Sequence, residues 1–167
     1  KWLPRLLSAF QQKFPNVEIE IGNASNPAQE LQAKVFDFII MAAAEADNNL
    51  ACVPLFEDQM VCIMPKDHPL SSKPWVAIED FSKFGLISHA EKRLSRFFQL
   101  ILEPAGIEPK RFMAVDQPNA IIELVASGFG ISVFPMWAVK SLLEACSLAA
   151  KPITRGGLPV TWYVAFL

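Results

Sequence analysis

Residues 120–137 read AIIELVASGFGISVFPMW, and this stretch says most about the fold of the chain. An apolar helix runs into Gly128, and a short glycine turn connects it to the apolar run 131–134, which stops at Pro135. Gly128 suits a left-handed helix C-cap, where a Cβ would clash. A four-residue apolar run suits a strand that is buried on both faces. A helix that feeds a buried strand through a tight turn is half of a parallel α/β unit.

Strands and helices alternate on both sides of this stretch, and such alternation implies parallel sheets with right-handed crossovers. The spacing of apolar residues predicts helices at residues 2–14, 26–35, 78–84, 94–102, 118–127 and 139–143. The predicted strands are residues 17–21, 38–41, 50–55, 58–65, 86–88, 112–115, 131–134 and 160–167.

The composition of the chain indicates a globular α/β protein. Its 167 residues are 52% hydrophobic and 19% charged, with a mean hydropathy of +0.28, so they can bury one ordinary core or two small lobes. The longest apolar run, residues 38–44, is far shorter than a membrane span. A net charge of −2 and a pI of about 5.7 do not predict the basic face of an independent DNA-binding domain.

The reactive side chains indicate neither a metal site nor an enzyme. Three cysteines without metal-like spacing predict buried thiols in a reducing, cytoplasmic compartment, and two histidines are too few for a His-rich site. Neither His68 nor His89 stands in a nucleophile pattern, and no glycine-rich loop matches a nucleotide fingerprint. We therefore expect no catalysis, no metal, no cofactor and no membrane contact. The chain opens inside an apparent helix without a signal peptide, so we expect it to be part of a longer protein.

Four segments in a fixed order resemble the effector-binding domain of LysR-type transcriptional regulators. They are PLFEDQMVCIMPKDHPL at 54–70, VAIEDFSKFGLIS at 76–88, FQLILEPAGIEPKRFMAVD at 98–116 and ELVASGFGISVFPMWAV at 123–139. The sequences LEPAGIEP and FPMWAV also resemble the branch of this family that regulates methionine biosynthesis. The resemblance covers nearly the whole chain, although the first strand, the terminal helix and the DNA-binding domain of the family are missing from it.

The resemblance implies an α/β fold in which two Rossmann-like lobes are joined by two crossing strands, as in periplasmic-binding proteins. Lobe one would comprise residues 1–57 and 156–167, and lobe two would be residues 58–155, inserted between them. Two crossings form a hinge, and a small ligand would lie between the lobes. DNA would be bound only through the missing N-terminal domain.

Candidate ligand contacts follow from a general rule for open α/β sheets. Such contacts come from loops at the carboxyl ends of strands and from helix N-termini. Arg93 opens a helix, where a cation is disfavoured by the helix dipole, and this misfit favours an anionic partner. The effector-binding candidates are Asn23, Ser25, Asn26, Ser88, His89, Arg93, Gln117, Asn119 and Met136.

Several of these candidates have an ordinary structural alternative. Asn26 and Gln117 stand where helix N-caps stand, with Pro27 at the first helical position and Gln29 able to close a capping box. His89 could instead be a solvated histidine in a loop, and Arg93 could lie at a solvent-exposed helix start. Met136 and Trp137 could pack in the core or at the hinge.

The function that we expect is the sensing of a small polar or anionic effector, such as an amino acid or a carboxylate. Binding of this effector would change how a homodimer or higher homo-oligomer of the parent protein is placed on DNA. The broad apolar stripe at residues 2–21 predicts a contact with a second copy of the chain. The resemblance implies that this contact is two-fold symmetric, with residues 90–102 of the second copy opposite the stripe. The alternative is an extracytoplasmic solute-binding protein of a transporter. A helix-turn-helix before residue 1 would favour the regulator, and a signal peptide there would favour the transporter.

Overall fold

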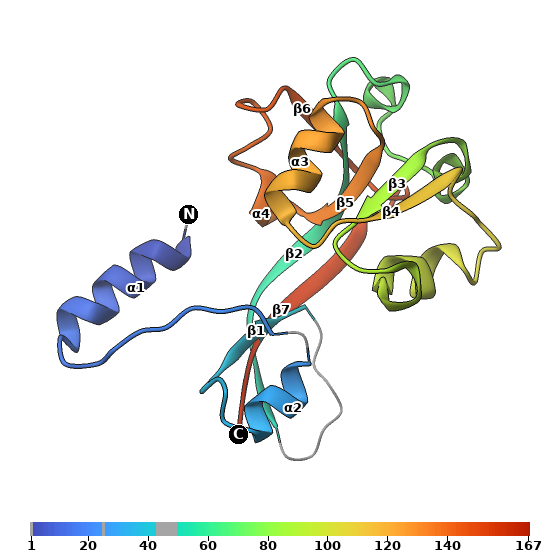
Figure 1. Ribbon diagram of the computed structural model, residues 1–167. Helices are drawn as coiled ribbons and strands as arrows, with labels where there is room; N and C mark the ends of the chain where they lie inside the picture. The colour runs from blue at the N-terminus through green and yellow to red at the C-terminus, as the bar shows by residue number, and fades with distance from the viewer. Residues whose placement is uncertain (1, 25, 43–49) are drawn as a thin grey trace.

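The structure, a computed structural model, contains one mixed sheet. Two long strands of this sheet run from one part of the molecule to the other. The structure describes residues 2–24, 26–42 and 50–167. The strand order is β1-β7-β2-β5-β3-β4, and β6 pairs with β2 beside this path. The long antiparallel strands β2 (Ala51–Pro65) and β7 (Leu158–Phe166) run side by side and connect the lower and upper parts of the molecule (Figure 1). The expectation of an α/β fold is confirmed.

The lower part is small. It holds β1 (Ile39–Met41), which pairs antiparallel with β7, and α2 (Pro27–Gln32), which buries Leu31. The first helix, α1 (Trp2–Lys13), stands to one side of the sheet and has no buried residue (Figure 1).

The upper part holds the parallel strands that the opening stretch predicts. β3 (Gly85–Ser88) pairs in parallel with β4 (Arg111–Ala114) and with β5 (Ile131–Pro135), and α3 (Pro118–Ala126) packs on them. Parallel pairing among the described strands is confined to this part. The remaining elements are 3-10 helices at Pro69–Ser72, Ile78–Lys83 and Lys92–Leu94, a π-helix at Phe98–Leu102, α4 (Met136–Val139) and β6 (Leu148–Pro152).

The glycine turn before β5 has the conformation that the sequence predicts. Gly128 has a φ of +79°, in the left-handed region that favours glycine. Two residues later, a Cβ on Gly130 would lie 2.5 Å from the carbonyl oxygen of Gly85 on β3. Ser132 then donates a buried hydrogen bond of 2.6 Å to the carbonyl oxygen of Ile87. This turn therefore sets how closely β5 approaches β3.

The strand β2 divides the core between the two faces of the sheet. Successive residues of a strand point to opposite faces. Accordingly, Cys62 and Met64 belong to one buried cluster with Phe81, whereas Val61 and Ile63 belong to the other, beneath α3. The prediction of buried thiols is confirmed only for Cys62, since Cys52 and Cys146 are half-buried. The pKa of Cys62 is raised by burial and, to a smaller extent, by the charge of Asp80.

The predicted strand at residues 17–21 is wrong, because this segment has no regular secondary structure. The alternation of apolar residues with glutamates is real, but no described strand pairs with the segment. Val17 and Ile21 are 44% and 73% exposed. Without a neighbouring strand, the segment has neither ladder hydrogen bonds nor an apolar face to cover.

Other elements differ in extent from the sequence predictions. The two strands predicted at 50–55 and 58–65 are one strand, in which the extra residue Leu55 forms a bulge next to Pro54, a residue without an N–H to donate. The helix predicted at 139–143 ends at Val139 and is followed by turns, and the strand β6 was not predicted. The helices predicted at 78–84 and 94–102 are largely 3-10 and π-helical.

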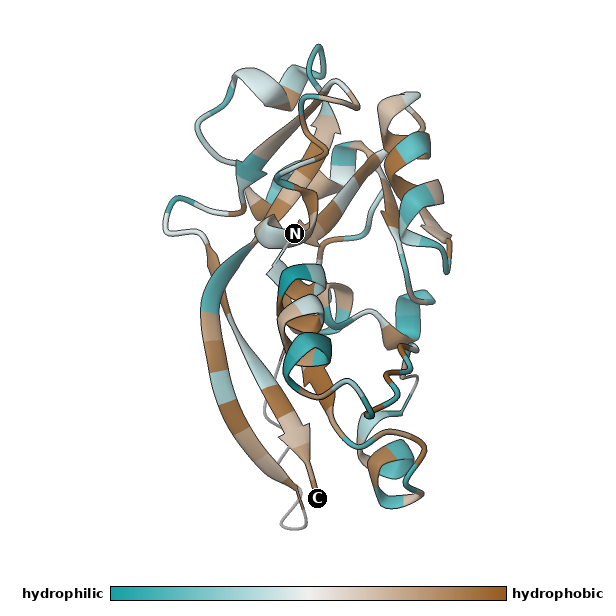
Figure 2. Cartoon of the chain, turned by 90° about the vertical axis from the view of Figure 1, so that its left-hand side faces the viewer, coloured by the Kyte–Doolittle hydropathy of each residue, from teal (hydrophilic) through white to brown (hydrophobic). Residues whose placement is uncertain are grey.

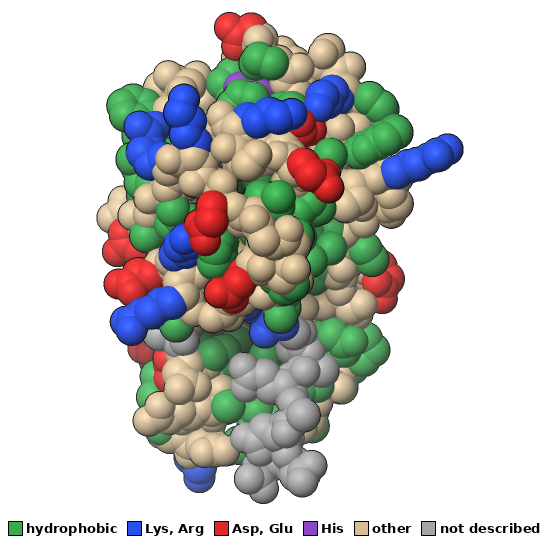
Figure 3. All heavy atoms as spheres, turned by 90° about the vertical axis from the view of Figure 1, so that its right-hand side faces the viewer, with side chains coloured by type: hydrophobic (Ala, Val, Ile, Leu, Met, Phe, Trp, Pro, Cys, Tyr) green, Lys and Arg blue, Asp and Glu red, His purple; other side chains and the backbone are tan. Residues whose placement is uncertain are grey.

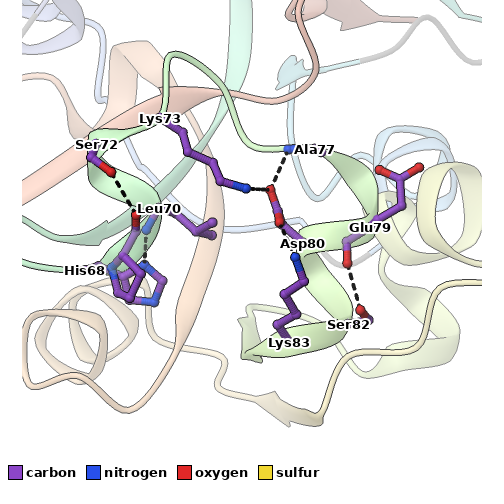
Figure 4. Close-up of polar contacts among 10 residues, drawn as sticks. His68, Leu70, Ser72, Lys73, Ala77, Glu79, Asp80, Ser82 and Lys83 are labelled. Carbon is purple, nitrogen blue, oxygen red and sulfur yellow. Dashed lines mark hydrogen bonds and ion pairs between the residues drawn. The ribbon is translucent and has the colours of Figure 1, made fainter.

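A buried carboxylate anchors the 3-10 helix at Ile78–Lys83 (Figure 4). Asp80 is only 2% exposed and accepts hydrogen bonds from Lys73 Nζ at 2.7 Å, Lys83 Nζ at 2.9 Å and the backbone N–H of Ala77 at 3.2 Å. Burial alone would raise the pKa of Asp80, but these hydrogen bonds and the charge of Lys73 outweigh it and lower the pKa to about 2.

The close approach at Gly130 can be tested by one substitution. Gly130→Ala places a methyl group against the backbone of β3, so we expect it to destabilise the domain by about 1–3 kcal/mol. Gly156→Ala is the matched control, since nothing lies within 4 Å of its added Cβ. Chemical denaturation measures both, and equal midpoints for the two variants would contradict the packing of β5 on β3.

The Asp80 anchor predicts a pH dependence of stability. Because the pKa of Asp80 in the folded protein lies below its ordinary value of 3.8, the stabilisation is complete above about pH 4 and is lost as the pH falls towards 2. The shift corresponds to about 2 kcal/mol. Denaturation of the wild type and Asp80→Asn across this range should show the wild type losing its advantage. Glu79→Gln, at an exposed neighbour, should leave the wild-type profile unchanged.

Candidate functional site

A cavity of about 480 Å³ opens where the crossing strands pass the upper sheet. This volume lies within the range of small-molecule sites. β2 and β7 contribute Met60 and Trp162 to its walls, and β3 and β5 contribute Leu86 and Val133. Ala42, which follows β1 in the lower part, also lines it. The cavity therefore touches both parts of the molecule and both strands that connect them.

Most of the cavity wall is apolar. Leu94, Phe97, Leu100 and Ile101 line one side from the irregular helical segment that follows β3. Leu94 and Leu100 are 64% and 60% exposed, so apolar side chains border the cavity without being covered by described residues. A π-helical turn of the kind that ends this segment is frequently found at functional sites.

Four polar side chains interrupt this wall. Ser88 Oγ accepts the backbone N–H of Ala90 at 3.3 Å, and Ser95 Oγ accepts that of Phe98 at 3.4 Å, so each hydroxyl keeps its proton for a further bond. His89 and Arg96 are exposed at the cavity. Arg96 forms no ion pair with any carboxylate in the described part of the chain.

The structure brings two of the sequence-predicted residues, Ser88 and His89, to the cavity. Arg93 instead points to Glu91, with 3.1 Å between its Nε and the carboxylate, and its side chain is 82% exposed. Ser25 lies outside the described residues. The described candidates that do not line the cavity are Asn23, Asn26, Arg93, Gln117, Asn119 and Met136.

Two of these candidates stand at helix N-termini. Asn26 caps α2: its side chain accepts the N–H of Gln29 at 3.4 Å, and its own N–H donates to the Glu30 carboxylate at 2.8 Å. The predicted cap is confirmed, and Glu30 rather than Gln29 completes the box. Gln117 is the N-cap residue of α3 but makes no side-chain capping bond.

Ser95 and Arg96 are the polar cavity residues that the sequence rule missed. The rule selects side chains directly after a strand, and Arg96 follows β3 by a full loop and a 3-10 turn. The sequence offered one indication of Arg96: it stands three residues after Arg93, where the helical segment resumes. That signal places both arginines near one helix start but does not tell which of them borders the cavity.

An aromatic cluster connects the cavity to α1. Trp162 lines the cavity and lies 5.4 Å from Trp137 and 6.4 Å from Phe56, between ring centroids. Trp2 of α1 lies 5.6 Å from Phe56 and 6.2 Å from Trp137. The indole N–H groups of these three tryptophans are buried, and they donate to no acceptor among the described residues.

The rest of the described surface includes one more open depression and side chains of mixed charge. Pro4, Arg5 and Ser8 line a shallow, open depression on α1 that is too flat to enclose a ligand. Figure 3 shows basic and acidic side chains interspersed over one face, without a continuous basic patch. Within residues 2–24, 26–42 and 50–167, no cluster of three metal-ligating side chains is present. None of the described helices is long and apolar enough to cross a membrane.

Comparison with known proteins identifies the family. The model of the LysR substrate binding domain matches residues 1–167. The transcriptional regulator MetR of Haemophilus influenzae is 30% identical over 167 residues, which cover 98% of this chain and 54% of that protein. The chain thus spans about half the length of the curated relatives that it matches.

Solved structures agree with this assignment. The regulatory domain of MetR from Neisseria meningitidis superposes with a TM-score of 0.82 at 33% identity, covering 99% of this chain and 77% of that one. The regulatory domain of Synechocystis CcmR in complex with 2-PG gives 0.84 at 26% identity, covering 99% and 81%. The periplasmic-binding-protein-like fold and the resemblance to the methionine-regulator branch are confirmed. The chain belongs to the LysR family of transcriptional regulators, as a substrate-binding, effector-sensing domain.

Proposed function

We propose that this domain senses a small polar or anionic metabolite in the cavity beside the crossing strands. The observation that carries the proposal is the position of the cavity, which is lined by Ala42 from the lower part, by both crossing strands and by the upper sheet. The CcmR regulatory domain, with the same fold, holds 2-PG. We place Ser88, His89 and Arg96 at the effector, while contacts from Asn23, Asn26, Arg93, Gln117, Asn119 and Met136 stay predictions.

The proposed mechanism is a change in the angle between two lobes. Lobe one is proposed as residues 1–57 and 156–167, and lobe two as residues 58–155. β2 carries the chain across the first boundary, and the second boundary lies just before β7. A ligand that touches both lobes and both strands binds one arrangement more tightly than another. Only this difference in affinity can shift the equilibrium between arrangements.

We further propose that the parent protein is a cytoplasmic regulator in which ligand binding here changes the engagement of DNA by another domain. Supporting this, the curated relatives are transcriptional regulators of about twice this length, rather than transport proteins or enzymes. The solute-binding alternative lacks such support, and we propose no catalytic activity. A DNA footprint of the full-length regulator, with and without ligand, is the direct test.

A homodimer is proposed through α1. The helix carries apolar and polar bands along its length (Figure 2), and Leu6, Phe10 and Phe14 are 56%, 40% and 42% exposed. The extended segment after it exposes Val17 and Ile21 as well. An apolar surface of this kind, left uncovered by its own domain, is typical of a contact with another chain.

The effector site can be tested by filling it. Ser88→Phe places a bulky ring at the cavity wall, so we expect loss of the thermal stabilisation that a bound effector provides by mass action. A thermal-shift screen of amino acids, carboxylates and phosphorylated compounds supplies the ligand. Ser127→Phe, at the exposed end of α3, is the control and should retain the ligand response. Equal ligand responses from Ser88→Phe and the wild type would place the effector elsewhere.

The dimer contact can be tested by charge. Leu6→Glu places a carboxylate on the exposed apolar band, and two-fold symmetry repeats it, so the dimer should dissociate at least tenfold more readily, or about 1.4 kcal/mol. Gln12→Glu adds the same charge on the polar side of α1 and should leave association unchanged. Analytical ultracentrifugation measures both, and a wild-type monomer at tens of micromolar would reject a dimer built by this domain.

A further inference from the structure

The rings of the aromatic cluster form a closed circuit between the cavity wall and α1. Trp162, which lines the cavity, stacks on Phe56 with 23° between the ring planes and meets Trp137 edge-on at 90°. Trp2 contacts the same two rings, at 76° to Phe56 and 59° to Trp137. No ring contact among the described residues joins Trp2 directly to Trp162. Phe56 and Trp137 therefore bridge α1 and the cavity wall.

The helix α1 is attached to the domain at its N-terminal half. It stands to one side of the sheet, and it has no fully buried residue (Figure 1). Trp2, Leu3 and Leu7 are half-buried, and its other described residues are exposed. A helix of 12 residues is only marginally stable without tertiary contacts. The bulky ring of Trp2 is therefore the main anchor of α1.

The carboxylate of Asp58 fixes the bridging ring of Trp137. The helix α4 begins directly after Pro135, and this N-cap residue makes no side-chain capping bond. The first N–H groups of a helix have no partner within the helix. Instead, the backbone N–H of Trp137 donates to the Asp58 carboxylate on β2 at 3.2 Å. Asp58 pairs with Val160, which lines the cavity, so this bond ties the start of α4 to the strands beside the cavity.

Resting on the proposed effector-sensing function, we propose that the four rings form a mechanical link by which the cavity wall sets the position of α1, with Asp58 as its positioning residue. Protein interiors are close-packed, so a ligand that displaces Trp162 also displaces Phe56 and Trp137. The contact of Trp2 with these rings then changes, and the exposed apolar band of α1 moves with it. No described residue of α1 lines the cavity, so the rings carry the signal to the helix.

Hydrogen–deuterium exchange of the α1 backbone amides, in the chain without added ligand, tests this link. Trp2→Ala removes the anchor and should speed the exchange of α1 about tenfold or more. Trp162→Leu removes a ring that makes no ring contact with Trp2. It should still speed the exchange about threefold or more, because both bridging rings lose a neighbour. Tyr163→Leu is the matched control, on the opposite face of β7 and outside the cluster, and should leave α1 unchanged.

Two variants at Asp58 test its positioning role. Asp58→Ala removes the acceptor of the Trp137 N–H and should speed the exchange of α1 as Trp162→Leu does. Asp58→Asn keeps an oxygen acceptor on a side chain of the same shape and should retain the wild-type exchange. The amides of β3 and β5 should stay protected in all these variants, which distinguishes a local release of α1 from unfolding.

The outcomes separate this inference from the function on which it rests. Wild-type exchange of α1 in Trp162→Leu and Asp58→Ala overturns the link, even if Trp2→Ala releases the helix. Wild-type exchange in Trp2→Ala rejects the anchor as well, and an equal increase in α1, β3 and β5 shows general destabilisation and also rejects the link. None of these results involves an effector, so the sensing function is tested separately by the ligand screen and Ser88→Phe.

Discussion

The antiparallel pairing of β2 and β7 is the constraint on which the rest of the structure depends. It extends from Ala51 opposite Phe166 to Met60 opposite Leu158, and β1 joins it on one side and β5 on the other. Because these strands span both parts of the molecule, the backbone ladder that holds the sheet also forms the connection that would bend in the proposed change of lobe angle. The bulge at Leu55 interrupts this ladder once. Bulges increase local twist, so this residue is a natural place for the two parts to change their angle.

The cavity shares its walls with this connection. Met60 and Trp162 belong to the paired strands themselves, while Ser88 and His89 end a strand of the upper sheet. A ligand seated there would contact the proposed hinge directly, so the proposed mechanism needs no long pathway between binding and motion. The interspersed charges in Figure 3 and the acidic pI fit a domain whose specificity lies in a cavity rather than over an extended charged face.

Sequence reasoning succeeded where a local physical rule decides the structure. A positive φ at Gly128, the cap at Asn26 and the strand β5 each depend on a few neighbouring residues, and all three were predicted. It failed where the outcome depends on distant partners. Residues 17–21 have the alternation of a strand but no strand to pair with, and β6 forms because the far end of β2 offers a free edge. The same limit applies to the site: chain position identified Ser88 and His89, but only packing distinguishes Arg96 from Arg93.

The four-ring cluster of Trp2, Phe56, Trp137 and Trp162 gives the domain a built-in optical reporter. Three of the four tryptophans of the chain are gathered there, on α1, α4 and β7. Indole emission is sensitive to hydrogen bonding at the ring nitrogen, and these nitrogens are buried and have no acceptor among the described residues. Entry of water or of a ligand atom at Trp162 would therefore change the colour of the emitted light. Effector binding at the proposed site would thus have an intrinsic spectroscopic signal that requires no added dye.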